Sequence, residues 1–156
     1  MLLLLYVSMN TDTTDLSPWF VTGFAEREST FTYSRTQRGL SIYFGMQFKP
    51  ADAPMLRRIR RFFGDAGRIY PRRPPGATRR SAATAYYYRV TRIGELLRIV
   101  SHFDLYPFQG ARRDSFEIWR EMVVLKAGPE PPEPGRLDLL AAQLSALVPP
   151  GRSRPR

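Results

Sequence analysis

Two carboxylates stand at the end of an apolar segment in a chain that is otherwise strongly basic. Glu26 and Glu28 close the stretch "PWFVTGFAERE", while the 156-residue chain carries a formal net charge of +10. Carboxylate oxygens suit hard divalent cations such as Mg²⁺. An anion at a helix C-terminus meets the negative end of the helix dipole, so it needs another partner, and a metal ion would serve. The alternative is that both acids are solvated residues at a helix end.

Almost all of the positive charge comes from arginine. Lys49 and Lys126 are the only lysines among 24 basic residues. Guanidinium groups bind phosphate through paired hydrogen bonds and stack on flat groups, so the composition favours a polyanionic partner. The alternative is that the charge only keeps the protein soluble, and the placement of the arginines must decide between the two.

Several classes of site are disfavoured by composition. The chain has no cysteine, which excludes disulfides, thiolate catalysis and cysteine-based zinc sites. His102 is the only histidine, which argues against a histidine metal site or a Ser-His-Asp triad, so we expect a packing or capping role for it. The opening "MLLLLYV" is too short to span a bilayer. We expect an intracellular protein without a membrane partner, with residues 1–14 as a flexible N-terminal extension.

The two carboxylates are positioned by a helix and a hairpin. Ser17 followed by Pro18 predicts a helix start, and the apolar residues after it predict a helix buried on more than one side. From Thr30 the apolar period changes to two, and "QRG" turns the chain into "LSIYFGMQF", which predicts a β-hairpin. "ADAPMLRRIRRFFGDAG" has apolar residues at helical spacing and predicts a second helix.

The rest of the chain predicts a second hairpin and more helices. "RIYPRR" and "AYYYRVT" are typical of strands, separated by the loop "PPGATRRSAA", and "IGELLRIVSHF" predicts a third helix. Asp114 and Glu117 indicate a capping box for "SFEIWREMVVLKA", which Gly128 closes. We expect a linker and C-terminal helix over 129–148 and a basic tail over 149–156.

This order predicts an α+β fold of the type αββαββα over residues 15–128. Its four-stranded antiparallel, saddle-shaped sheet would carry the helices on one face and leave the other open. If Phe31, Phe44, Met46 and Phe48 point into the core, the open face carries Thr32, Ser34 and Thr36 beside Tyr43, Gln47 and Lys49. A polar, partly basic, concave sheet suits a DNA groove.

The stretch "VTGFAEREST" resembles the motif of the LAGLIDADG homing endonucleases. Gly23 matches the motif's first glycine, Glu26 its first acid and Glu28 its second acid. The passages "LRRIRRFFGDAGRIY", "YYYRVTRIGELLRIVSHFDLYPFQGARR" and "SFEIWREMV" resemble later parts of the family in the family order. The resemblance covers roughly Pro18 to Lys126 and implies the same αββαββα fold.

The resemblance also implies an activity and a partner. A single copy of the motif implies a homodimer, in which Gly23 lets two helices approach closely and Phe20 and Phe24 are covered. The implied function is a site-specific, Mg²⁺-dependent, intron-encoded DNA endonuclease that cuts both strands of a long pseudo-palindromic site. The alternative is a non-cleaving member of the fold that acts as an intron RNA maturase or a DNA-binding regulator.

The resemblance assigns roles to particular residues. Glu28 is the implied metal ligand, Gln47 the residue that orders the catalytic water, and Arg112 the basic group near the scissile phosphate. Aligning the family backwards from Leu56 and Ile59 places Pro50 at that position instead of Gln47, and Arg113 is the neighbouring alternative to Arg112. This chain departs from the motif at Arg27, where a small residue is usual, and at Ser29, where glycine is usual.

DNA contacts are expected from the open face and the loop between the second pair of strands. The expected residues are Thr32, Ser34, Thr36, Lys49, Arg68, Tyr70, Arg72, Arg73, Arg79, Arg80 and Arg89. Arginines on the strands pair well with guanine edges, whereas the loop arginines suit phosphates.

Overall fold

The computed structural model describes residues 16–147. The expectations for residues 1–14 and 149–156 lie outside this range. The elements are α2 (Pro18–Glu28), β1 (Ser29–Thr36), β2 (Gly39–Phe48), the 3₁₀ turn η1 (Pro50–Asp52), α3 (Ala53–Phe62), β3 (Arg68–Arg72), β4 (Ala85–Val90), α4 (Ile93–Leu105), α5 (Arg112–Ala127) and α6 (Arg136–Ala146). Among these helices none is long and apolar enough to cross a membrane.

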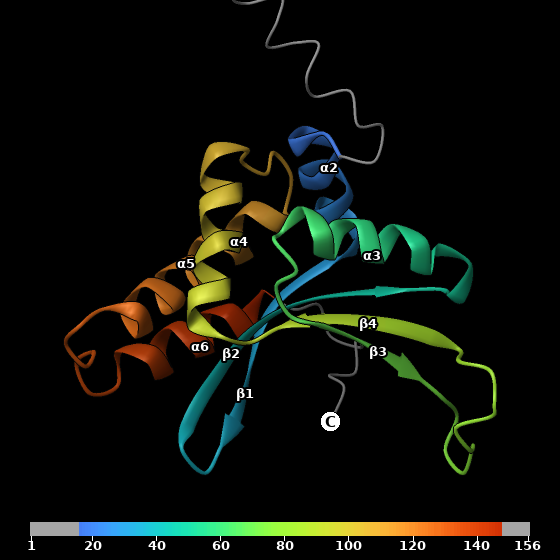
Figure 1. The fold of residues 1–156 in the computed structure, drawn as a ribbon. Helices are drawn as coiled ribbons and strands as arrows, with labels where there is room; N and C mark the ends of the chain where they lie inside the picture. Colours follow the sequence, from blue (N-terminus) through green and yellow to red (C-terminus); the bar gives the residue numbers. More distant parts are fainter. Residues whose placement is uncertain (1–15, 148–156) are drawn as a thin grey trace, which may run out of the picture.

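The four strands form one antiparallel sheet in the order β1-β2-β4-β3. All helices lie on one side of it, and the sheet is arched so that its open face is on the inner side of the arch (Figure 1). The predicted αββαββα fold is confirmed, and α5 and α6 follow it. Gly67, before β3, has a φ of +68°, and an added Cβ would lie 2.3 Å from the carbonyl oxygen of Arg89, so only glycine fits there.

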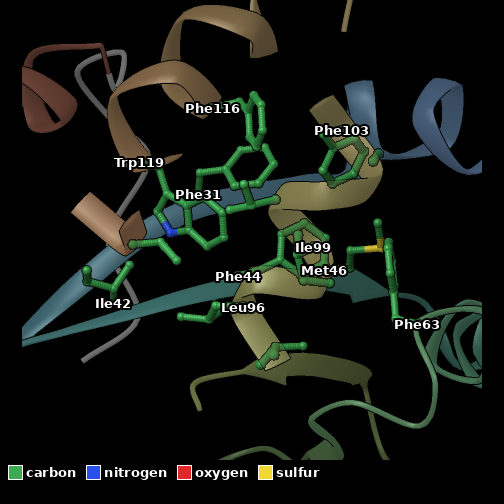
Figure 2. Close-up of a cluster of buried hydrophobic side chains, with 14 of the residues drawn as sticks. Phe31, Ile42, Phe44, Met46, Phe63, Leu96, Ile99, Phe103, Phe116 and Trp119 are labelled. Atoms are coloured by element: carbon green, nitrogen blue, oxygen red, sulfur yellow. The ribbon is translucent and has the colours of Figure 1, made fainter. Parts of the chain in front are cut away.

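The hydrophobic core lies between the sheet and the helices (Figure 2). Alternate residues of β2 point into it, and all of Leu40, Ile42, Phe44, Met46 and Phe48 are buried. The Phe31 ring lies 4.9 Å from the Trp119 ring and 5.8 Å from the Phe103 ring, so aromatic side chains from β1, α4 and α5 interlock. Because one face of β2 is apolar, its register leaves the other face to solvent.

The start of α5 differs from the predicted capping box. The helix begins at Arg112, two residues earlier than Asp114, and its N-cap is Ala111 without a side-chain capping bond. Ala111 already has helical backbone angles, and the Arg113 N–H donates to the Gly110 carbonyl, so the turn before the helix supplies the first bond. Glu117 pairs with Arg113 one turn away, 3.0 Å apart, and is therefore no part of a capping box.

Candidate nucleic-acid interface

The strand register places one set of polar residues on the open face. Tyr43 on β2 pairs with Thr32 on β1, and Gly45 pairs with Thr30 on one side and with Arg89 on the other. The same face continues to β3, where Arg68 pairs with Arg89. Among the residues predicted for DNA contact, the register brings together on this face Thr32, Ser34, Thr36, Arg68, Tyr70, Arg72 and Arg89.

Two arginines on the open face lie against tyrosine rings. The Arg89 guanidinium carbon is 4.1 Å from the centre of the Tyr43 ring, a cation–π contact. The Arg72 guanidinium donates a 3.0 Å hydrogen bond to the Tyr87 hydroxyl. Stacking on a ring restricts a guanidinium without using its N–H donors. The sequence did not predict the side-chain contact between Tyr43 and Arg89, because this contact depends on the register between β2 and β4.

The other predicted contact residues lie around the edges of this face. Lys49 is exposed just after β2, and Arg79 and Arg80 are exposed in the loop between β3 and β4. Arg73 is different, because its guanidinium donates a 3.0 Å bond to the Ser81 carbonyl across the same loop. Arg73 thus ties the two sides of the loop together.

The helix α2 passes directly into β1 at the end of the acidic motif. Ser29 has φ −87° and ψ 157°, ordinary extended angles, so the position does not need glycine. Ser29 is buried, and its hydroxyl donates a 2.5 Å bond to the Ala25 carbonyl. The departure from glycine in the motif is therefore compatible with the family's helix-to-strand junction, and the serine closes the last turn of the helix.

Glu28 sits at this junction with a partly exposed carboxylate. Its Oε1 lies 3.6 Å from Nε of Arg27, whose side chain is 89% exposed. An ion pair this open to water is worth at most about 1 kcal/mol, so a stronger ligand can displace it. In residues 16–147 no three acidic, histidine or cysteine side chains come together at one point. One chain therefore offers Glu28 as a single carboxylate.

Gln47 lies on the open face close to the same junction. Met46 pairs with Ser29, so Gln47 is the next β2 residue toward the end of α2, and its own partner on β4 is Tyr87. Pro50 begins the turn η1 and lies outside the sheet. The structure thus places Gln47, and not Pro50, on the surface that ends near Glu28.

Arg112 also reaches the end of α2. Its Nε donates to the Glu26 carbonyl and its Nη2 to the Arg27 carbonyl, both at 3.2 Å. A helix leaves its last carbonyls without partners, and a cation there is favourable to the helix dipole. The guanidinium therefore caps the helix that carries Glu28. Arg113, the neighbouring candidate, points to Glu117.

Glu26 faces away from Glu28, toward the loop before α5. An added Cβ at Gly110 would lie 2.0 Å from its Oε1, so the carboxylate packs against that glycine. Its Oε2 is buried and has no hydrogen-bond partner among the described residues. The side chain lines a cavity of about 220 Å³ together with Trp19, Thr22, Gly23, Pro107, Phe108 and Gln109. The two acids of the motif therefore have different surroundings.

One face of α2 is exposed and apolar. Trp19 is 53% exposed, Phe20 is 43% exposed, and nothing lies within 4 Å of a Cβ placed on Gly23. Phe24 is half-buried, because its ring packs 5.0 Å from that of Phe48. Of the three residues predicted for a dimer interface, Phe20 and Gly23 are thus exposed, whereas Phe24 is half-buried. Trp19 adds to this face and was missed by the sequence analysis.

His102 joins α4 to the buried side of α2. Thr22 Oγ1 donates to the Tyr106 carbonyl at 2.8 Å and lies 3.1 Å from His102 Nε2, so the ring donates to the threonine. The rings of Phe62, Phe63, Phe103 and Tyr106 surround the imidazole. Burial lowers the pKa of His102 to about 4, which keeps the ring neutral. The expected packing role is confirmed.

Comparison with known proteins identifies relatives of this arrangement. The family model described as LAGLIDADG endonuclease matches residues 21–123. A protein of Podospora anserina, described as an uncharacterized 50.9 kDa protein in ND4 intron 1, is 31% identical over 110 residues. The match covers 70% of this chain and 24% of the relative, so the chain spans about a quarter of that protein's length.

Solved structures of homing endonucleases have the same fold. The archaeal intron-encoded homing endonuclease I-Vdi141I, complexed with DNA, superposes with a TM-score of 0.69 at 21% identity, over 89% of this chain and 88% of that chain. The LAGLIDADG meganuclease I-AabMI, bound to uncleaved DNA, gives a TM-score of 0.68 at 25% identity, over 81% of this chain and 44% of that chain. The matched motif, the confirmed fold and a family model that spans more than half of the sequence agree, and the chain belongs to the LAGLIDADG endonuclease family.

Proposed function

We propose that the protein is a site-specific DNA endonuclease that acts as a homodimer, requires a divalent cation, and cuts both strands of a long pseudo-palindromic site. One observation carries this proposal. The open face, with its exposed arginines and tyrosines, ends beside the C-terminus of α2, where the partly exposed Glu28 lies. A surface suited to a phosphate backbone thus leads directly to a carboxylate suited to a cation.

DNA binding is supported by the form and chemistry of the sheet. The open face lies on the inner side of an arch (Figure 1), a shape that matches the convex surface of a duplex. Two-stranded β-ribbons enter the major groove, where arginine reads guanine through two hydrogen bonds. The relatives I-Vdi141I and I-AabMI were solved with DNA, which supports this partner for a chain of the same family.

A divalent cation fits the chemistry of Glu28. The carboxylate is a hard oxygen ligand, its side chain is 36% exposed, and its only ion pair among residues 16–147 is the weak contact with Arg27. A Mg²⁺ ion held there would supply charge neutralisation at a phosphate and activation of a water molecule. In a homodimer the second copy of Glu28 would bring a second carboxylate to the twofold axis. Glu26 does not fit this role, because its carboxylate packs against Gly110.

Other residues of the chain would orient the reacting groups. Arg112 holds the carbonyls at the end of α2 and so limits the movement of the Glu28 backbone. Gln47, with an amide that can both donate and accept, would orient the water from the edge of the open face. The exposed apolar face of α2 at Trp19, Phe20 and Gly23 would form the dimer contact and bring the two Glu28 side chains together.

The proposal is tested by incubating the full-length protein with DNA that contains its intronless insertion site, with and without Mg²⁺. We expect binding in both conditions and double-strand cleavage only with the cation. Sedimentation of the protein with this DNA should give two chains per duplex. Failure to bind the duplex would contradict the proposal as a whole.

A second candidate function is favoured by the contact between Arg27 and Glu28. The guanidinium stands 3.6 Å from the carboxylate, where it competes with a cation. A protein that binds nucleic acid without cutting, as an intron RNA maturase or a DNA-binding regulator, would tolerate this contact. Tight binding of the insertion site without cleavage, at any Mg²⁺ concentration, would favour this function over the first.

A further inference from the structure

The β1–β2 hairpin extends beyond the rest of the sheet. β4 pairs with β2 only from Phe44 to Phe48, so the segment Gly39–Tyr43 has a neighbour on one side alone. Together with its β1 partners this segment forms a two-stranded ribbon, residues 32–43, which includes the turn at Gln37 and Arg38. An isolated two-stranded ribbon is at best marginally stable in water, so this one needs support from its back.

Two helices supply that support. From α5, Trp119 Nε1 donates a 3.0 Å bond to the Tyr43 carbonyl, and Lys126 Nζ donates to the Leu40 carbonyl. Both carbonyls belong to the part of β2 that does not pair with β4. α6 contacts β1 on the face opposite the open face, where the hydroxyl groups of Tyr33 and Ser145 lie 2.7 Å apart. Arg35 pairs with Asp138 of the same helix at 2.8 Å.

The buried residues of α6 show that the helix is packed into the hydrophobic core and does not only touch the ribbon at the surface. Leu140, Ala141 and Leu144 are at most 2% exposed and belong to the same core as the sheet. The pair of Arg35 with Asp138 is largely exposed and contributes little. These buried residues hold α6 against α5. The contacts of Tyr33 with Ser145 and of Arg35 with Asp138 connect the packed helix to the ribbon. The helix lies beyond residues 21–123, the part of the chain that matches the family model.

The ribbon lies at the far end of the open face from the acidic junction. β1 runs eight residues from Ser29, next to Glu28, to Thr36 at the turn. At about 3.3 Å per residue this is about 23 Å. DNA rises 3.4 Å per base pair, so the turn would stand about seven base pairs from the position of Glu28. On the open face the ribbon presents Ser34, Thr36 and Ser41.

We propose that α6 is a brace that fixes the ribbon against the duplex, and that recognition of the outer base pairs of each half-site depends on it. The inference rests on the proposed DNA binding. A ribbon that is free to bend at Phe44, where the pairing with β4 ends, cannot hold hydrogen-bond donors in register with base edges, whereas a braced ribbon can. Base pairs near Glu28 are read by the four-stranded part of the sheet and do not depend on α6.

The test uses a duplex that the full-length wild-type protein selects from random sequence. Each base pair of the selected site is substituted in turn, and the loss of affinity is measured for each variant. For wild type we expect a loss of about tenfold or more at well-read positions, both inner and outer. In Leu144→Asp, which places a charge in the buried contact of α6, the losses at outer positions should fall below about threefold, with inner positions unchanged.

The matched control is Leu139→Asp on the same helix. Leu139 is 50% exposed and Leu144 is 2% exposed, so the two variants share one chemical change and differ in burial. Leu139→Asp should keep the wild-type profile at every position. A folded Leu144→Asp with the wild-type profile would overturn the brace, and so would an equal weakening at inner and outer positions.

A milder variant keeps the test decisive if Leu144→Asp does not fold. Tyr33→Phe combined with Asp138→Asn removes the two contacts that connect α6 to the ribbon and leaves the packing of α6 on α5 in place. A selective weakening at the outer positions supports the brace, and an unchanged profile refutes it. If the wild-type protein selects no duplex at all, the proposed DNA binding fails first, and the brace fails with it.

Discussion

At the scale of single residues, the open face differs from the rest of the surface in how its arginines are held. Arg89 is exposed and stacks on Tyr43, and its guanidinium donates no hydrogen bond among residues 16–147, whereas Arg120 on α5 donates twice to Asp104. A guanidinium whose orientation is fixed by a ring, and whose N–H donors are not used within the protein, is well suited to bind a base edge or a phosphate.

Arg89→Ala should therefore weaken binding to the insertion-site duplex in a sequence-dependent way. We expect a loss of about 1–3 kcal/mol in discrimination at one base pair. Arg57→Ala is the matched control, since Arg57 is also exposed but lies on α3, on the other side of the sheet (Figure 1). Equal effects of the two substitutions in a titration at constant salt would show that only net charge matters.

His102 makes the stability of the fold depend on pH. Its pKa is lowered from 6.5 to about 4 by burial, so the unfolded chain binds a proton at a pH where the folded chain does not. The stability is fully present above about pH 6.5 and is lost as the pH falls toward 4. We expect the free energy of unfolding in urea to drop by about 2 kcal/mol between about pH 7 and about pH 5.

The control for this pH dependence is His102→Gln, which keeps a donor for Thr22 and removes the titrating ring. The drop between about pH 7 and about pH 5 should shrink in this variant. If the variant and the wild type lose the same stability over that interval, other groups account for the effect.

At the scale of elements, the end of α2 is held by α5. Arg112 donates to two carbonyls at the helix end, and Ser29 closes the last turn through Ala25. The helix end therefore has a fixed position relative to the sheet, which the proposed role of Glu28 requires.

Arg112→Ala should lower the free energy of unfolding by about 1.5–3 kcal/mol, because hydrogen bonds to a charged group are lost and carbonyls are left without partners. Arg113→Ala, one residue away, removes only an exposed pair with Glu117 and should cost about 0.5 kcal/mol or less. Urea unfolding of both variants provides the comparison. Similar losses would contradict the capping role.

The elements were predictable from the sequence where a single physical signal was strong. The period-two alternation of β2 predicted its buried face correctly, and Ser17 with Pro18 predicted the start of α2. The capping box at Asp114 was wrong, because a backbone bond from Arg113 to Gly110 starts the helix earlier. A local pattern cannot report such a bond, since it depends on how the preceding loop packs.

At the scale of the whole molecule, charge is divided between the two sides of the sheet. Arginines on the helix side are often paired with acids, as in Arg120 with Asp104 and Arg136 with Glu121. Within residues 16–147, arginines of the open face and its loop such as Arg68, Arg79 and Arg80 are exposed and form no ion pair with an acid. The open face and its loop therefore carry positive charge that no acid neutralises, which suits a polyanionic partner.

Binding to duplex DNA should weaken steeply with added salt. Each phosphate contact contributes about −0.9 to the slope of log K against log salt concentration, since counterions are released. Replacing both Arg79 and Arg80 with alanine should make the slope shallower by up to about 1.8. A flat response of the wild type to salt would count against nucleic acid as the partner.

The site was less predictable from the sequence than the fold. The motif indicated Glu28 as the candidate ligand, but only the pairing of Met46 with Ser29 shows that Gln47, and not Pro50, lies on the open face near it. The stack of Arg89 on Tyr43 and the contact of α6 with Tyr33 join residues far apart in the chain, and no local spacing encodes them. Contacts of this kind follow from packing between elements, which sequence periodicity does not specify.

The central claim is that Glu28, and not Glu26, holds the cation for cleavage. The most direct measurement compares Glu28→Gln with Glu26→Gln on the intronless insertion site in Mg²⁺, with binding measured in parallel. We predict that Glu28→Gln binds the duplex like wild type but does not cut it, while Glu26→Gln binds and cuts. Cleavage by Glu28→Gln at the wild-type rate would contradict the account.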